Sequence, residues 1–216
     1  PPATATLQDL LVDEGQDLPL GFFRMSRFLA KNITVFADEN QQLHDRNTTL
    51  AEIAGAIGAT EHLQLRRNYR NTAEIAAVAA RFYSGTPTGV PDPPTRHGQP
   101  PTLSRYTRDS DFADFIARYV SPRTHLSIGI AYQTWRQQKH AYNQLTFRKL
   151  PVPVQTYSSR VPDHRKLDFT RPAVTIVNYQ SIKGLEFDAL FVPELQQVTR
   201  DPTSASTRML FYVVTS

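Results

Sequence analysis

The sequence predicts an α/β fold whose sheets are parallel. Short apolar segments with strand character alternate with segments of helical periodicity, and this β-α-β-α-β order is typical of parallel sheets joined by right-handed crossovers. The first strand, residues 10–12, is an aliphatic run, which suits a strand covered on both faces. It ends in Asp13 and Glu14, and ligands of open α/β sheets bind at the carboxyl ends of strands. We therefore expect a functional site there.

The composition indicates a globular chain without disulfides. Its 216 residues are 40% hydrophobic and 20% charged, enough to bury one good core or two small ones. The absence of cysteine excludes disulfides and thiolate metal sites and fits a reducing, cytoplasmic location. No apolar run approaches the ~20 residues that span a bilayer, so no membrane partner is expected. The formal net charge of +4 permits nucleic-acid binding without establishing it, and no oligomeric state is predicted.

In the first half of the chain, periodicity and turn residues predict five further elements. Residues 21–31 form an expected helix with an apolar stripe in the core, made of Phe22, Phe23, Met25, Phe28 and Leu29. A second strand over residues 33–37 also ends in an acidic residue, Asp38. A helix over residues 50–57 that ends at Gly58, a strand over residues 62–65 and a helix over residues 72–83 follow. Six prolines between residues 87 and 101 predict an irregular segment.

The second half repeats the alternation of strand and helix. Strands are expected over residues 103–106, 126–132, 152–157, 174–178 and 190–192. Helices are expected over residues 109–120, with Phe112, Phe115, Ile116 and Tyr119 on one face, and over residues 135–145. Residues 160–171 are polar and read as a loop, and a last element begins near Thr207.

Five stretches, in a fixed order, resemble motifs of the UvrD/Rep-like superfamily I DNA helicases. DEGQD at residues 13–17 is similar to their Walker B motif. VFADENQQ at residues 35–42, LRRNYRNT at 65–72, YQSIKGLEFD at 179–188 and MLFYVVTS at 209–216 resemble motifs III, IV, V and the start of VI. The resemblance implies an ATP-dependent DNA helicase or translocase built from RecA-like (P-loop NTPase) lobes and acting on single-stranded DNA or a duplex junction. It implies the C-terminal part of a first lobe over residues 1–66 and a second lobe, without the large inserted domain, over residues 67–216.

The resemblance assigns the chemistry of ATP hydrolysis to four side chains. Asp13 would hold Mg²⁺, and Glu14 would orient or deprotonate the attacking water. Gln41 would sense the γ-phosphate, because an amide can both donate to phosphate and accept from water. Arg70 would act as a finger delivered across the cleft between the lobes. The alternative for Gln41 is a turn residue that caps the following segment.

Further residues would bind the rest of the nucleotide and the DNA. By resemblance Tyr69 stacks on adenine, with a core tyrosine as the alternative, while Glu186 contacts the ribose and Gly184 lets the backbone come close. His44 and Arg46 stand where the family usually has aromatic residues that stack between bases, so the usual aromatic ratchet is in doubt. Gln180 and Ser181, in the stretch that resembles motif V, would contact the backbone of a DNA strand.

The sequence contains no G-x-x-x-x-G-K-[ST] phosphate loop, and it ends before the motif VI arginine. We therefore expect a fragment of a longer helicase that does not hydrolyse ATP on its own. Two alternatives stay open: a degenerate helicase-like module that binds nucleic acid or protein without hydrolysis, and the motor segment of a helicase–nuclease fusion. The simplest reading of the first motif alone is a strand that ends in a solvated acidic turn.

Overall fold

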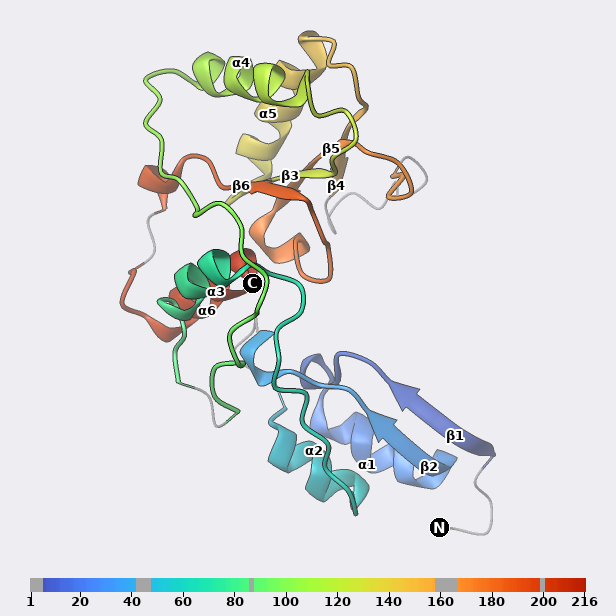
Figure 1. The fold of residues 1–216 in the computed structure, drawn as a ribbon. Coiled ribbons are helices and arrows are strands. Elements are labelled where there is room, and N and C mark those ends of the chain that lie inside the picture. The colour runs from blue at the N-terminus through green and yellow to red at the C-terminus, as the bar shows by residue number, and fades with distance from the viewer. Residues whose placement is uncertain (1–5, 42–47, 86–87, 158–166, 199–200) are drawn as a thin grey trace. The chain divides into compact units, whose positions relative to one another are not determined.

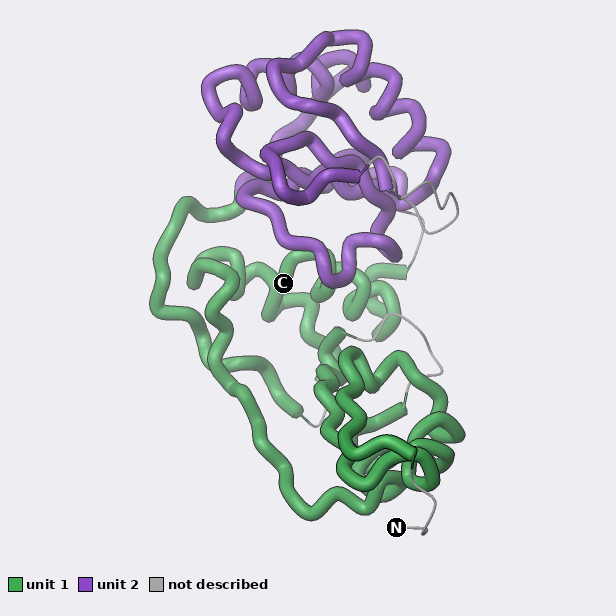
Figure 2. Tube along the Cα trace, turned by 90° about the vertical axis from the view of Figure 1, so that its right-hand side faces the viewer, with its two compact units in different colours: residues 1–101, 201–216 green, residues 102–200 purple. Residues whose placement is uncertain are grey.

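The computed structural model describes residues 6–41, 48–85, 88–157, 167–198 and 201–216. The chain forms two compact units, coloured separately in Figure 2. Unit 1 contains Pro1–Pro101 and Asp201–Ser216, and unit 2 contains Thr102–Arg200. The lobe boundary predicted between residues 66 and 67 falls inside unit 1, so the compact units divide the chain at other points, and the assignment of the lobes stays a prediction.

Unit 1 is built around two parallel strands, β1 (Leu7–Val12) and β2 (Ala30–Val35), joined through helix α1 (Leu20–Leu29). Their register runs from Leu7 beside Ala30 to Val12 beside Val35, so both strands end at the same edge. Helices α1 and α2 (Leu50–Ile57) pack on one face of the pair (Figure 1), where Val12, Phe23 and Ile53 form the core. Each strand is followed by a short 3₁₀ turn, η1 (Gly15–Asp17) and η2 (Glu39–Gln41).

Helix α1 corrects one prediction about the core. Of its five apolar side chains expected inside, only Phe23 is buried, whereas Met25 and Phe28 are each 66% exposed. Phe22 and Leu29 are also exposed. Because the sheet beside this helix has two strands and α2 covers only part of the helix surface, a single narrow stripe of α1 is covered.

The remaining part of unit 1 pairs α3 (Ala73–Ala80) with the last helix, α6 (Ala205–Thr215). The two helices pack through Ala79, Met209 and Tyr212, and the Phe82 and Phe211 rings lie 5.4 Å apart between centroids. Helix α6 also contacts η2. Segments more than 120 residues apart in the sequence therefore meet here, and the element expected near Thr207 is a helix.

Two predicted strands are wrong, one in unit 1 and one in unit 2. Residues 62–65 and 103–106 have no strand conformation, and Leu63 and Leu65 are 94% and 96% exposed. The described part of the proline-rich segment supplies one isolated bridge, between Arg67 and Asp92. Proline has no N–H to donate, so this segment cannot extend a ladder along the apolar runs. Without a partner strand, these two runs stay irregular, as the sequence also predicts for the proline-rich segment.

Unit 2 contains a four-stranded parallel sheet in the order β4 (Val154–Tyr157), β5 (Val174–Asn178), β3 (Ile128–Tyr132) and β6 (Ala189–Phe191). Helices α4 (Asp109–Val120) and α5 (Trp135–Phe147) pack on one face (Figure 1). The sheet confirms the predicted parallel α/β class and, from residue 109 to residue 191, the predicted order of helices and strands. No helix in the described residues is long and apolar enough to cross a membrane.

The opposite face of this sheet is covered in part by a turn that precedes β6. Gly129 of β3 faces that turn, and a Cβ atom on Gly129 would lie 2.4 Å from Cδ2 of Phe187. The ring therefore packs directly on the backbone of the central strand, in space that only glycine leaves open.

The substitution Gly129→Ala is expected to destabilise unit 2 by about 1–3 kcal/mol, because the Phe187 ring must leave its place on the sheet. Urea unfolding followed by the fluorescence of Trp135, the single tryptophan of the chain, measures the loss. Gly55→Ala is the control, since a Cβ there meets nothing within 4 Å. In mid-helix this control should stabilise the protein by about 0.5–1 kcal/mol. Equal effects of the two substitutions would contradict the packing described here.

Candidate functional site

The turn after β1 closes onto the end of β2 through backbone contacts. The Gly15 N–H donates to the Phe36 carbonyl at 2.9 Å, and the Phe36 N–H donates to the Val12 carbonyl at 2.8 Å. A Cβ on Gly15 would lie 2.4 Å from Cγ1 of Val35, so this close approach requires glycine. Glu14, just before it, adopts a left-handed conformation with φ of 52°. The acidic pair is therefore held on a turn of fixed shape.

Gln16 is fully buried, and its amide joins the two strand ends. Its Nε2 donates to Oε2 of Glu14 at 2.5 Å, and its Oε1 accepts from the Asp38 N–H at 3.0 Å. Its backbone carbonyl accepts from the Thr48 N–H at 3.2 Å. A buried amide with both ends satisfied fixes its neighbours, because breaking either bond leaves a polar group unpaired away from water.

Asp38 continues the same chain of hydrogen bonds to Gln41. Its Oδ2 accepts from Nε2 of Gln41 at 3.1 Å, and its Oδ1 accepts from the Asn40 N–H at 2.9 Å. Two predicted catalytic residues, Glu14 and Gln41, are thus linked through Gln16 and Asp38. We call the side chains of Glu14, Gln16, Asp38 and Gln41, together with the backbone N–H of Asp38, the strand-end network.

Two buried polar side chains of turn η2 bond to other segments of unit 1 and hold the turn in place. Glu39 accepts from the Leu50 N–H at 2.8 Å and from the Thr88 hydroxyl at 2.8 Å. Asn40 donates to the Gly89 carbonyl at 2.9 Å. On the other side, burial and the Asp38 carboxylate raise the pKa of Tyr212 in α6 to about 12. The position of Gln41 is therefore set by contacts to three separate segments of unit 1.

Asp13 is exposed at the end of β1, and within the described residues only its Oδ1 accepts a hydrogen bond, from the Glu14 N–H at 2.9 Å. One exposed carboxylate fits Mg²⁺, which keeps several waters and is typically bound by one or two carboxylates plus substrate phosphates. The described residues contain no group of three or more histidine or acidic side chains arranged to hold a metal by themselves.

Tyr69 and Arg70 lie on an exposed turn of unit 1. Oδ1 of Asn68 accepts from the N–H groups of Arg70 and Asn71 at 3.0 and 3.2 Å. Tyr69 is 78% exposed, so the core-tyrosine alternative is wrong, and the guanidinium of Arg67 lies 5.9 Å from its ring centroid. Arg70 belongs to the same compact unit as the acidic pair, and lobe closure stays a prediction.

The predicted residues of the motif V stretch lie in unit 2, at two places. Gln180 and Ser181 follow the carboxyl end of β5, where the Ser181 N–H donates to Oδ1 of Asn178 at 3.0 Å. Gln180 is exposed and Ser181 is buried. The predicted DNA contacts at His44 and Arg46 lie outside the described residues.

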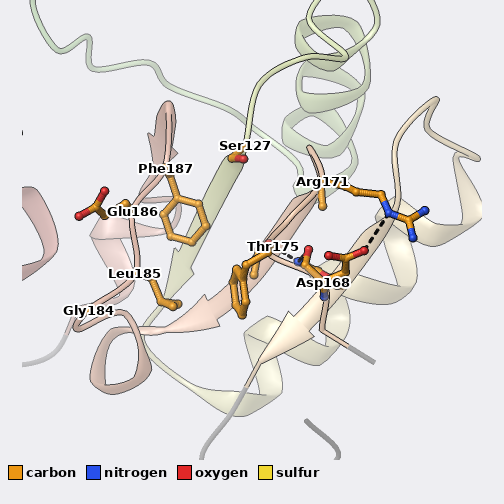
Figure 3. A pocket seen from close by; sticks show the side chains of 11 residues that line it. Ser127, Asp168, Arg171, Thr175, Gly184, Leu185, Glu186 and Phe187 are labelled. Atoms are coloured by element: carbon orange, nitrogen blue, oxygen red, sulfur yellow. Dashed lines mark hydrogen bonds and ion pairs between the residues drawn. The ribbon is translucent and has the colours of Figure 1, made fainter. Parts of the chain in front are cut away.

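Gly184 and Glu186 line a pocket of about 360 Å³ on the face of the sheet that faces away from α4 and α5. Figure 3 shows the Leu185 and Phe187 side chains beside it, with the Glu186 carboxylate pointing away from them. Gly184 has φ of 77°, a conformation that favours glycine. The pocket also adjoins Ser127 and Ala173, which precede β3 and β5, so it lies towards the amino ends of these strands.

We compared the chain with protein-family models, curated proteins and solved structures, and none of the three comparisons found a match.

Sequence reasoning missed the supporting residues of the site. The sequence predicts no role for Gln16, which stands within DEGQD, or for Glu39 and Asn40. The available signal was the run of polar residues directly after each strand, since polar groups buried at such a place must find partners. The strands themselves are mostly exposed, with Leu11 at 72%, so the prediction of a first strand covered on both faces is wrong.

Replacing Gln16 with leucine, a side chain of similar size, should destabilise unit 1 by about 1–3 kcal/mol, because the Glu14 carboxylate and the Asp38 N–H each lose their hydrogen bond to the Gln16 amide. Urea unfolding followed by circular dichroism measures the loss, and hydrogen exchange should show a faster Asp38 amide. Gln8→Leu, at an exposed position in β1, is the matched control. An unchanged Asp38 exchange rate in the Gln16 variant would show that the amide does not hold the two turns together.

Proposed function

We propose that the chain is part of an ATP-dependent DNA helicase or translocase of the superfamily I kind, with RecA-like lobes. The observation that supports this function best is the strand-end network. It links the two residues whose actions the mechanism must couple, the water-activating Glu14 and the phosphate-sensing Gln41. It also lies at the carboxyl ends of parallel strands, where α/β proteins bind ligands.

In this proposal each member of the network has a separate task. The Glu14 carboxylate accepts a proton from the attacking water, and Gln16 keeps that carboxylate in a fixed orientation. The Gln41 amide exchanges its bond to Asp38 for a bond to the γ-phosphate. Asp38 is bonded to both amides, to Gln41 through its carboxylate and to Gln16 through its backbone N–H. A change at Gln41 therefore reaches Gln16, and so Glu14, through the backbone of Asp38. Phosphate binding is thereby coupled to water activation.

Asp13 holds the metal in this proposal, and Arg70 binds phosphate from the exposed turn. When bound, Mg²⁺ neutralises charge on the phosphates. Arg70 donates to phosphate oxygens in a two-pronged geometry. The exposed ring of Tyr69 offers a face on which adenine can stack. In unit 2, Gln180 and Ser181 contact the sugar-phosphate backbone of single-stranded DNA, and Glu186 contacts ribose.

A second candidate function is a helicase-like module that binds nucleic acid or protein without hydrolysis. One observation favours it: Glu14 and Gln41, which should act on water and phosphate, are each hydrogen-bonded to a neighbouring side chain of the same unit. In such a module the network would only stabilise the strand ends. The affinity for a nucleotide distinguishes the two functions, because only the motor should need Mg²⁺ and Arg70 to bind a nucleotide.

The chain is expected to bind a fluorescent, non-hydrolysable ATP analogue in a Mg²⁺-dependent way. Charge-assisted hydrogen bonds contribute about 1.5–3 kcal/mol, so Arg70→Ala should weaken binding roughly 10- to 100-fold. Asp13→Asn should remove most of the Mg²⁺ dependence. Binding is the readout because this sequence holds no Walker A loop and turnover is not expected of it.

Two exposed residues of the same types, Arg24 and Asp9, provide the controls through Arg24→Ala and Asp9→Asn. These variants should bind the analogue as the unmodified chain does. Equal affinities for all four variants, or binding that ignores Mg²⁺, would contradict the motor and favour the binding module.

A further inference from the structure

The described part of the proline-rich segment returns to the turn that carries Arg70. The Ala73 N–H, at the start of α3, donates to the Arg96 carbonyl at 2.8 Å. The guanidinium of Arg96 donates to the backbone carbonyl of Arg70. Arg96 therefore contacts both sides of the turn, through its backbone and through its side chain.

Glu74, in the first turn of α3, makes two bonds to the next residues of that segment. Its Oε1 lies 2.9 Å from Nδ1 of His97, and its Oε2 accepts from the Gly98 N–H at 2.8 Å. These bonds lower the pKa of Glu74 to about 2, with His97 as the larger cause. The carboxylate is therefore ionised, and able to accept both bonds, throughout the physiological pH range.

Gly98 packs on the cap of the same helix. A Cβ on Gly98 would lie 2.7 Å from Cγ2 of Thr72, and the Thr72 hydroxyl caps α3 by accepting from the Ile75 N–H at 3.4 Å. The segment thus approaches the helix start as closely as a residue without a side chain allows. We call residues 96–98 the clamp.

We propose that the clamp positions Arg70 for phosphate binding, with Arg96 as the residue that fixes the Arg70 backbone. This inference rests on the proposed function, because it gives Arg70 a phosphate to bind. Its physical basis is entropy. Fixing the backbone of one residue costs about 1–2 kcal/mol, and an exposed turn that is not ordered in advance incurs this cost when phosphate binds.

A merely structural role predicts something different from positioning. If the clamp only fastened the proline-rich segment to α3, its loss would lower stability and leave nucleotide affinity unchanged. If the clamp orders Arg70 in advance, its loss weakens nucleotide binding, and only while Arg70 is present. The second outcome is a coupling between two residues of which one does not touch the ligand.

A double-mutant cycle between Arg96→Ala and Arg70→Ala tests the inference, with affinity for the Mg²⁺-bound ATP analogue as the readout. Arg96→Ala alone should weaken binding about 5-fold, the equivalent of a lost ordering contribution of ~1 kcal/mol. In the Arg70→Ala background the same change should have an effect of less than about 2-fold. Glu74→Ala should reproduce the Arg96→Ala effect in both backgrounds. Arg24→Ala is the matched control.

Hydrogen exchange gives a second readout that does not depend on nucleotide. In Arg96→Ala the Ala73 amide, and the Arg70 and Asn71 amides of the turn, should exchange faster, whereas amides in β1 should not change. Unaltered far-UV circular dichroism shows that the variants fold.

Each failure has its own meaning. Unchanged affinity in Arg70→Ala contradicts the proposed function and this inference with it. Weaker binding in Arg70→Ala together with unchanged binding in Arg96→Ala and Glu74→Ala overturns the clamp alone. An equal loss from Arg96→Ala in both backgrounds also overturns the clamp, because the effect then does not act through Arg70.

Discussion

The buried amide of Gln16 joins the ends of two parallel strands, and the candidate site of unit 1 depends on it. One end of the amide holds the Glu14 carboxylate, and the other holds the backbone of Asp38. A two-stranded sheet fixes the direction of its strands but not the side chains beyond them, so an interaction across the ends is needed to make a site of two turns. The close approach at Gly15 gives this interaction its geometry.

Much of the fold could be predicted because local signals agreed with the final packing. Helix α2 begins at a capping box formed by Thr49 and Glu52 and ends at Gly58 with φ of 67°, so its predicted bounds are correct. Residues 62–65 and 103–106 have the residue types of strands but do not pair with another strand. The sequence could not predict this, because a strand needs a partner and no local signal reports that the partner is missing. The apolar side chains of α1 are exposed for a similar reason, because the two-stranded sheet and α2 cover only part of this helix.

The candidate site was predictable in part. Asp13 and Glu14 could be located because an apolar run ended in carboxylates, and Asp38 because the next strand ended in the same way. The linking role of Gln16 depends on burial, and the contact between Arg96 and the Arg70 turn joins residues 26 positions apart through an irregular segment. Neither the role of Gln16 nor the Arg96 contact produces a periodic pattern in the sequence. Function beyond these residues rests on a resemblance to helicase motifs and stays a proposal.

Paramagnetic broadening is the most direct test of a nucleotide site at the strand ends of unit 1, because it locates a nucleotide-bound metal without assuming where the metal binds. Mn²⁺ would be added with a non-hydrolysable ATP analogue, and the backbone amide signals of the isotopically labelled chain would be recorded. Signals from Asp13, Glu14, Gln41 and Arg70 are expected to broaden first. Broadening centred instead on the unit 2 pocket around Phe187, or spread evenly over the surface, would contradict a nucleotide site at these strand ends.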